Sequence, residues 1–122
     1  MATAMPRRRV LFIEDEPALR QSYERAFSGR YDAAFAATGQ EALRLLAVHR
    51  PQVAILDLRL PDTDGIELLG RLRELVPTLP VIITSAYLSF EPQLQVLGLP
   101  HSGYLVKPFD LVALAERIDA LG

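Results

Sequence analysis

The chain has 122 residues, of which half are hydrophobic and 23% are charged, with 13 basic and 15 acidic side chains. This length and composition are typical of one globular domain, which we expect to span residues 1–122 with residues 1–8 as a flexible lead-in. The net charge of −2 disfavours direct binding to nucleic acid. The basic run Arg7-Arg8-Arg9 is short, and we interpret it as a solvated lead-in that needs no partner. The chain lacks cysteine, a signal peptide and any apolar run of membrane-spanning length, so we expect a cytoplasmic protein without a membrane partner.

The first half of the chain predicts two strand and helix pairs. Pro17 stands where a helix can begin, with apolar residues at helical spacing after it. Thr38 and Glu41 have the spacing of a capping box and open the second helix. The expected order is a strand over 9–13, a helix over 17–28, a strand over 31–36 and a helix over 39–50.

The second half continues the alternation. Residues 53–56 are apolar without alternation, which suits a central parallel strand covered on both faces. Asp64 and Asp110 each precede an amphipathic stretch as helix caps, whereas 87–101 is interrupted by glycine and proline. The expected order is a strand over 53–56, a helix over 65–76, a strand over 80–85, a short or irregular helix within 87–101, a strand over 103–106 and a helix over 111–121.

The alternation predicts a fold class. Strands that alternate with helices form a parallel sheet, so we expect an α/β, flavodoxin-like, doubly wound sheet of five strands with five helices. In such sheets the ligand crevice lies outside the carboxyl ends of the strands, where the strand order reverses.

Polar residues stand at the end of, or directly after, four of the five predicted strands. They are Glu14, Asp15 and Glu16 after the first, Asp57 after the third, Ser85 at the end of the fourth and Lys107 after the fifth. Carboxylates that converge in one crevice repel each other unless a hard cation binds them, and Mg²⁺ suits one or two carboxylates together with a phosphate. Asp57 is the central candidate for a nucleophile that forms an aspartyl phosphate, with Lys107, Ser85 and Mg²⁺ around the transferred group.

The chain closely resembles the receiver domain of two-component response regulators. The resemblance covers essentially the whole chain and rests on four motifs in the order typical of that family: Phe12-Ile13-Glu14-Asp15-Glu16-Pro17, Leu56-Asp57-Leu58-Arg59-Leu60-Pro61-Asp62-Thr63-Asp64-Gly65, Ser85-Ala86 and Lys107-Pro108-Phe109.

The resemblance implies a role for each site residue. Asp57 is expected to accept phosphate from the phosphohistidine of a sensor histidine kinase or a phosphotransfer protein. Glu14, Asp15, Asp57 and the backbone carbonyl of Arg59 are the expected Mg²⁺ ligands. Lys107 would pair with the phosphate, Ser85 and Tyr104 would be the switch residues, and the Lys107-Pro108 bond would be cis. The surface of the fourth helix, fifth strand and fifth helix would contact an output protein or domain, and a homodimer through that surface is left open. No enzymatic activity is expected beyond the domain's own phosphorylation and dephosphorylation.

The sequence also departs from the typical family pattern. Glu14 is one methylene longer than the aspartate that is common there, and Arg59 lies at a position that tunes dephosphorylation. Asp62 and Asp64 are interpreted as loop and cap residues. Thr84 is a rival to Ser85, but strand alternation sends the two hydroxyls to opposite faces.

Two other functions compete with this one. Phosphohydrolases of the haloacid dehalogenase type place an acid two residues after the nucleophile, where this chain has Arg59. A receiver-like interaction module that works without phosphorylation would lack Asp57, the acid pair or Lys107, and all of these are present. The sequence leaves open whether the chain is a complete regulator or one domain of a longer protein.

Overall fold

The computed structural model describes residues 7–86 and 101–121, and its centre is one parallel sheet. The five strands are β1 (Arg9–Ile13), β2 (Asp32–Ala36), β3 (Val53–Asp57), β4 (Val81–Ser85) and β5 (Gly103–Val106). They pair in parallel in the order β2-β1-β3-β4-β5, so the order reverses between β1 and β3. The predicted parallel sheet and its strands are confirmed, with boundaries that differ by at most one residue.

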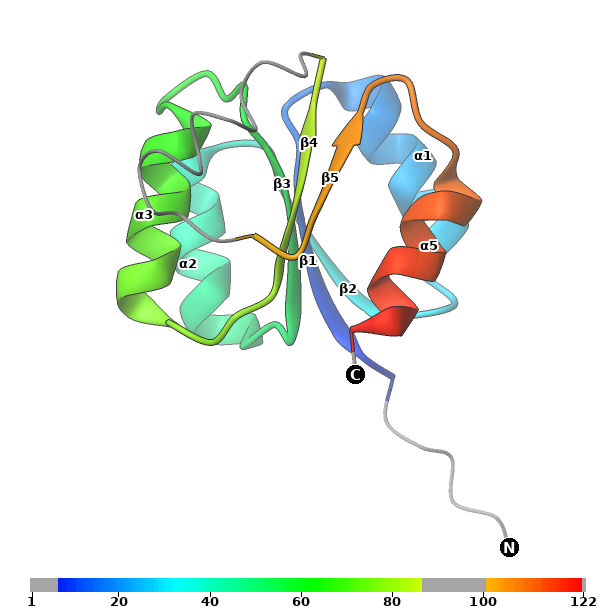
Figure 1. The fold of residues 1–122 in the computed structure, drawn as a ribbon, viewed down its shortest axis with the longest axis horizontal. Helices are drawn as coiled ribbons and strands as arrows, with labels where there is room; N and C mark the ends of the chain where they lie inside the picture. Colours follow the sequence, from blue (N-terminus) through cyan, green and yellow to red (C-terminus); the bar gives the residue numbers. More distant parts are fainter. Residues whose placement is uncertain (1–6, 87–100, 122) are drawn as a thin grey trace, which may run out of the picture.

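Helices cover both faces of the sheet, as Figure 1 shows. Helices α1 (Pro17–Phe27) and α5 (Leu111–Ala120) lie on one face, and α2 (Gly39–His49) and α3 (Gly65–Leu75) lie on the other. The predicted fourth helix falls almost entirely within 87–100, outside the described residues. None of the described helices is long and apolar enough to cross a membrane.

The predicted caps explain where three helices begin. The Thr38 hydroxyl accepts a hydrogen bond from the Glu41 amide at 3.1 Å, so the first half of the capping box is present. Asp64 and Asp110 cap α3 and α5 in the same way, each accepting from the amide two residues later. No side chain caps the start of helix α1. The helix begins instead with Pro17, whose ring restricts its φ angle to a value that suits a helix.

The core has two layers because each strand sends alternate side chains to opposite faces. Leu11, Ile13, Ala54 and Leu56 pack toward α2 and α3, whereas Val10, Phe12, Val53 and Ile55 pack toward α1 and α5. Both faces of β1 and β3 are therefore buried, which explains why their sequences are apolar without alternation. A charged side chain on these strands has room only at a strand end.

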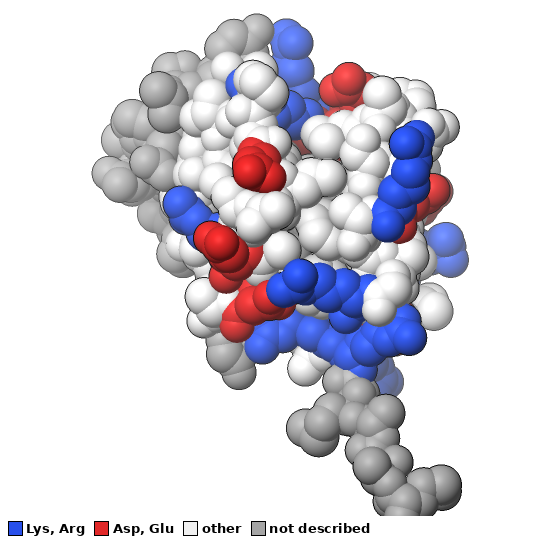
Figure 2. Space-filling view, turned by 90° about the vertical axis from the view of Figure 1, so that its right-hand side faces the viewer, with Lys and Arg blue, Asp and Glu red and all other residues white. Residues whose placement is uncertain are grey.

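The arginines before β1 contact the rest of the chain, in contrast to the solvated lead-in that the sequence suggested. The Arg8 guanidinium donates to the carbonyls of Ile118 and Leu121 at 2.6 and 2.5 Å, and so caps the last turn of α5. The Arg7 guanidinium donates to the Ser28 carbonyl at 3.2 Å. Figure 2 shows Lys and Arg side chains gathered along the lower edge of the face that α1 and α5 form.

Candidate active site at the carboxyl edge of the sheet

The fold brings the predicted site residues to one edge of the sheet. Asp57 is the last residue of β3, Ser85 is the last residue of β4, and Lys107 directly follows β5. Glu14 and Asp15 directly follow β1. Asp15, Asp57, Ser85 and Lys107 line one cavity of about 470 Å³ together with Glu16, Pro17, Arg59 and Ala86.

Three carboxylates meet at this edge. Oxygen atoms of Glu14, Asp15 and Asp57 all lie within 4.8 Å of one another. Glu14 is fully buried and Asp57 is 3% exposed, whereas Asp15 is exposed. Carboxylates so close together repel each other unless a cation or a proton intervenes, so the cluster suits an oxygen-ligated cation.

Lys107 supplies one positive charge between two of these carboxylates. Its Nζ atom lies 2.9 Å from Glu14 Oε1 and 2.9 Å from Asp57 Oδ2. Burial alone lowers the pKa of the ammonium, but the contacts with Glu14 and Asp57 outweigh that effect and raise its pKa above the usual value. Lys107 therefore stays charged and screens part of the repulsion.

Glu14 has an unusual titration for a carboxyl group. Burial raises its pKa from 4.5 to about 7, the hydrogen bond from Lys107 opposes that rise, and the nearby Asp57 carboxylate adds to it. Glu14 Oε2 also accepts a hydrogen bond from the Glu16 amide at 3.1 Å. The buried carboxyl group is thus poised between its neutral and charged forms near neutral pH.

The loop from β3 to α3 is fixed by backbone contacts. The Arg59 amide donates to Asp57 Oδ1 at 3.0 Å, which orients the Asp57 carboxylate, and the Gly65 amide donates to the Leu58 carbonyl at 3.0 Å. Only glycine fits at position 65, because a Cβ atom there would lie 2.3 Å from the Leu58 Cα atom. The loop therefore holds a compact turn next to Asp57.

Asp62 anchors the middle of the same loop. Its two carboxylate oxygens accept from the Gly39 and Gln40 amides at 2.8 and 3.0 Å, so it caps the first turn of α2. These two hydrogen bonds, that from Gly39 first, lower the pKa of the Asp62 carboxyl group. Asp64 caps its own helix as predicted, whereas Asp62 caps a neighbouring one.

The two candidate hydroxyls at the end of β4 lie in different places. Ser85 lines the cavity with Asp57, and Thr84 is buried but is not among the lining residues. Tyr104, the candidate switch aromatic on β5, is half-buried against the core beneath α2 and α3. Its ring meets the edge of the His101 ring, with the two centroids 5.9 Å apart. The Lys107-Pro108 bond is cis, as the resemblance implied.

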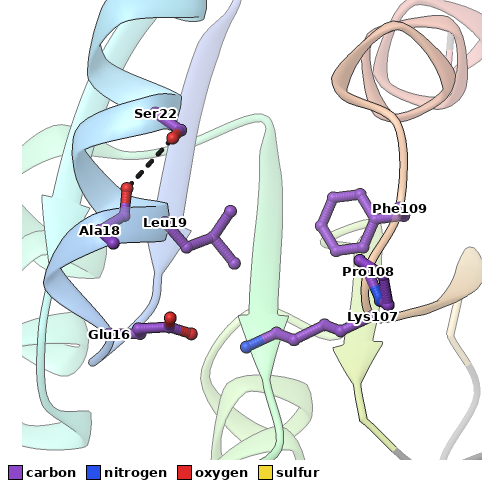
Figure 3. Close-up of a pocket in the computed structure, with 7 residues that line it drawn as sticks. All are labelled: Glu16, Ala18, Leu19, Ser22, Lys107, Pro108 and Phe109. Atoms are coloured by element: carbon purple, nitrogen blue, oxygen red, sulfur yellow. Dashed lines mark hydrogen bonds between the residues drawn. The ribbon is translucent and has the colours of Figure 1, made fainter.

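A second cavity adjoins the first on the α1 and α5 side. It has a volume of about 450 Å³ and shares Glu16 and Lys107 with the first cavity. Figure 3 shows Leu19 and Phe109 pointing toward each other across it, with Glu16 and Lys107 at one end. An apolar hollow thus opens beside the carboxylate cluster.

Sequence reasoning missed two side chains near the site. The Tyr23 phenol is buried, and its pKa is raised well above the usual value, first by burial and then by the negative charges of Glu14 and Asp57. Arg20 donates from one guanidinium nitrogen to the backbone carbonyls of Glu14 and Asp15. Nothing in the sequence indicates that either side chain contacts the site.

Comparisons with known proteins agree with this geometry. A family model described as the response regulator receiver domain matches residues 10–119. The transcriptional regulatory protein KdpE of Mycobacterium tuberculosis is 40% identical over 112 residues, which are 91% of this chain and 49% of that protein. The response regulator MprA of Mycolicibacterium vanbaalenii is 36% identical over 114 residues, which are 93% of this chain and 49% of that protein. The chain therefore spans about half the length of these curated relatives.

A solved structure shows the same likeness. The response regulator TrrA of Thermotoga maritima, in complex with Mg²⁺-BeF, superposes with a TM-score of 0.83 at 27% identity, over 94% of this chain and 99% of that one. Family model, relatives and fold thus agree, and they agree over nearly the whole chain. The chain belongs to the response regulator receiver domain family.

Proposed function

We propose that Asp57 of this receiver domain accepts a phosphoryl group in a Mg²⁺-dependent step and so switches a protein-interaction surface. The observation that carries the proposal is the position of Lys107, whose ammonium lies 2.9 Å from both the Asp57 and the Glu14 carboxylates at the edge of an open cavity. A nucleophile, a cation and a hydroxyl donor in one cavity are the groups that phosphoryl transfer needs.

The donor set fits a magnesium ion. Carboxylates of Glu14, Asp15 and Asp57, with the Arg59 backbone carbonyl, would supply oxygen ligands of the kind that Mg²⁺ prefers. When bound, Mg²⁺ would neutralise part of the charge on the phosphoryl oxygens. The protein crystallised with Mg²⁺-BeF among the structural relatives supports this choice of metal.

The chain's own residues would position and stabilise the transferred group. One Asp57 carboxylate oxygen forms the new bond to phosphorus while the bond from phosphorus to the donor's histidine nitrogen breaks. The Arg59 amide holds the other Asp57 oxygen in place. Lys107 moves from the carboxylates to the phosphoryl oxygens, and the Ser85 hydroxyl donates to them, with Tyr104 following that motion.

Mapping the residue that carries the phosphoryl group tests this proposal. The protein is incubated with Mg²⁺ and acetyl phosphate, the acyl phosphate is converted with hydroxylamine, and the modified peptide is sequenced by mass spectrometry. We expect modification at Asp57 alone. Modification elsewhere, or none in a folded protein that binds Mg²⁺, would contradict the proposal and favour an interaction module that works without phosphorylation.

The phosphodonor is proposed to be a protein, namely a sensor histidine kinase or a phosphotransfer protein. The apolar hollow lined by Leu19 and Phe109 supports this, because it opens beside Lys107 and offers a partner an uncharged surface next to the nucleophile. The Leu19→Ser substitution is expected to slow transfer from an autophosphorylated histidine kinase while leaving the rate with acetyl phosphate unchanged. Val48→Ser on α2, where Val48 is 72% exposed, is the matched control, and an equal effect of both substitutions would contradict this docking site.

A cytoplasmic location follows from the kinase partner, and an output protein or domain would read the phosphorylated surface near β5 and α5. A homodimer through that surface would appear as an increase in sedimentation coefficient on phosphorylation. Catalysis is proposed to be limited to the domain's own phosphorylation and dephosphorylation.

A further inference from the structure

Asp15 is the least supported member of the carboxylate cluster. Glu14 and Asp57 are buried, and their carboxylates are held by Lys107 and by backbone amides. Asp15 is exposed, and within the described residues it takes part in a single hydrogen bond, which its backbone carbonyl accepts from Arg20. Its position therefore depends on what holds the backbone between β1 and α1.

Arg20 holds that backbone. Its Nη1 atom donates to the Glu14 carbonyl at 3.0 Å and to the Asp15 carbonyl at 3.1 Å. The Arg20 amide donates to the Glu16 carbonyl at 3.0 Å in the first turn of α1, and the Arg20 side chain reaches back over the residues before the helix. One half-buried side chain thus bonds to both of the residues that follow β1.

Within the described part of the chain, Arg20 donates to backbone carbonyls and not to carboxylates. A guanidinium ordinarily pairs with a carboxylate when one is within reach, and such a pairing would compete with a metal ion. Among the described residues, no ion pair joins Arg20 to Glu14 or Asp15, and the guanidinium bonds to their carbonyls instead. The carboxylates therefore remain available to a cation while their backbone is fixed.

We infer that Arg20 is a positioning residue for the metal site, because it fixes the loop from which Glu14 and Asp15 present their carboxylates. This inference rests on the proposed function in that it takes the cluster as a Mg²⁺ site. Residues that orient metal ligands typically change metal affinity by about 10–100-fold when they are removed. Arg20 would act in that way through the backbone.

The direction in which Mg²⁺ affinity changes when Arg20 is removed distinguishes a positioning role from a purely electrostatic one. Removal of a positive charge near an acidic cluster would by itself strengthen the binding of a cation. Loss of the loop anchor would weaken it, because Asp15 would have to be ordered when the metal binds. A positioning role therefore predicts a change in affinity opposite to that expected from charge alone.

The test is isothermal titration calorimetry with Mg²⁺ on the whole chain and three variants. Arg20→Met keeps the apolar stem and removes the donors, and we expect its Mg²⁺ dissociation constant to rise by about tenfold or more. Arg20→Lys keeps the charge but offers one smaller donor group, and an intermediate value is expected. Arg25→Met removes the same charge from an exposed position in the last turn of α1 and should leave the constant unchanged. An Arg20→Met protein that binds Mg²⁺ as tightly as the wild type, or more tightly, would overturn the inference.

A second measurement separates this inference from the proposed function and needs no metal. The Glu16 amide donates to Glu14 Oε2, and its hydrogen exchange in the metal-free protein should be faster in Arg20→Met than in the wild type, and unchanged in Arg25→Met. If Arg20→Met is too unstable for calorimetry, the Mg²⁺ dissociation constant and the hydrogen exchange of Arg20→Lys are compared with those of the wild type instead. Unchanged exchange at the Glu16 amide would overturn the positioning role, whereas a wild-type protein that does not bind Mg²⁺ would overturn the proposed function instead.

Discussion

The substitution Glu14→Gln should stabilise the metal-free protein while it damages the proposed Mg²⁺ site. Glu14 is fully buried, and its pKa is raised from 4.5 to about 7 by burial, against the opposing contact with Lys107. A carboxyl group with a raised pKa in the folded state favours the unfolded state whenever it is ionised. Glutamine has nearly the same shape and can accept from Lys107 without carrying that charge.

The magnitude follows from the shift in pKa. Each unit corresponds to about 1.4 kcal/mol, so ionised Glu14 lowers the free energy of unfolding by up to about 3 kcal/mol. The penalty is absent below the unfolded pKa of 4.5 and complete above the folded pKa of about 7. The expected advantage of Glu14→Gln is therefore about 3 kcal/mol near pH 8 and about 1 kcal/mol near pH 5.

Urea denaturation in the presence of a chelator measures this difference at both pH values. Glu16→Gln, which removes the same charge from an exposed neighbour, is the matched control. Addition of Mg²⁺ near pH 8 should stabilise the wild type and have little effect on Glu14→Gln, because a ligand stabilises the state that binds it. If the advantage of Glu14→Gln over the wild type did not grow between pH 5 and pH 8, or if Glu16→Gln gained as much, burial of the ionised Glu14 would not be the cause.

Three further predictions concern other contacts. Lys107→Met removes the cation that lies between the two buried carboxylates, so Mg²⁺ should bind more tightly by calorimetry while phosphorylation by acetyl phosphate slows; weaker Mg²⁺ binding would contradict this. Gly65→Ala places a Cβ atom 2.3 Å from the Leu58 Cα atom and should cost more than about 2 kcal/mol in urea denaturation. Its control, Gly70→Ala, has open space and should stabilise α3 by up to about 1 kcal/mol, and equal effects of the two would refute the steric argument. Arg8→Ala removes the cap of α5 and should cost about 1–3 kcal/mol, with faster amide exchange confined at first to that helix.

The sheet could be predicted from the sequence because its signals are local. Residues of β1 and β3 are apolar on both faces, and this pattern does not depend on which helices cover them. Thr38, Asp64 and Asp110 cap helices within two or three residues of themselves, so their roles are also visible in the chain. The site followed from the same logic, since the carboxyl ends of parallel strands share one edge.

The contacts that support the site could not be predicted, because they join segments that are distant in the sequence. Asp62 caps a helix that begins 23 residues earlier, and Arg8 caps a helix turn 110 residues later. The burial of Glu14 and its contact with Lys107 likewise require the packing of β5 against the rest of the sheet. Arg20 is nearer to its acceptors, but a basic residue in the first turn of a helix gives no sign of the carbonyls to which it will donate. Distant pairing and side-chain direction are set by tertiary packing.

Intact-mass measurement shows whether Asp57 is a Mg²⁺-dependent phosphoacceptor. The wild-type protein and Asp57→Asn are each incubated with acetyl phosphate, with Mg²⁺ and with a chelator. We expect one added phosphoryl group in the wild type with Mg²⁺, and none with the chelator or in Asp57→Asn. An adduct that forms without Mg²⁺ or persists in Asp57→Asn would contradict this role of Asp57, as would the absence of any adduct in a wild-type protein shown to be folded and to bind Mg²⁺.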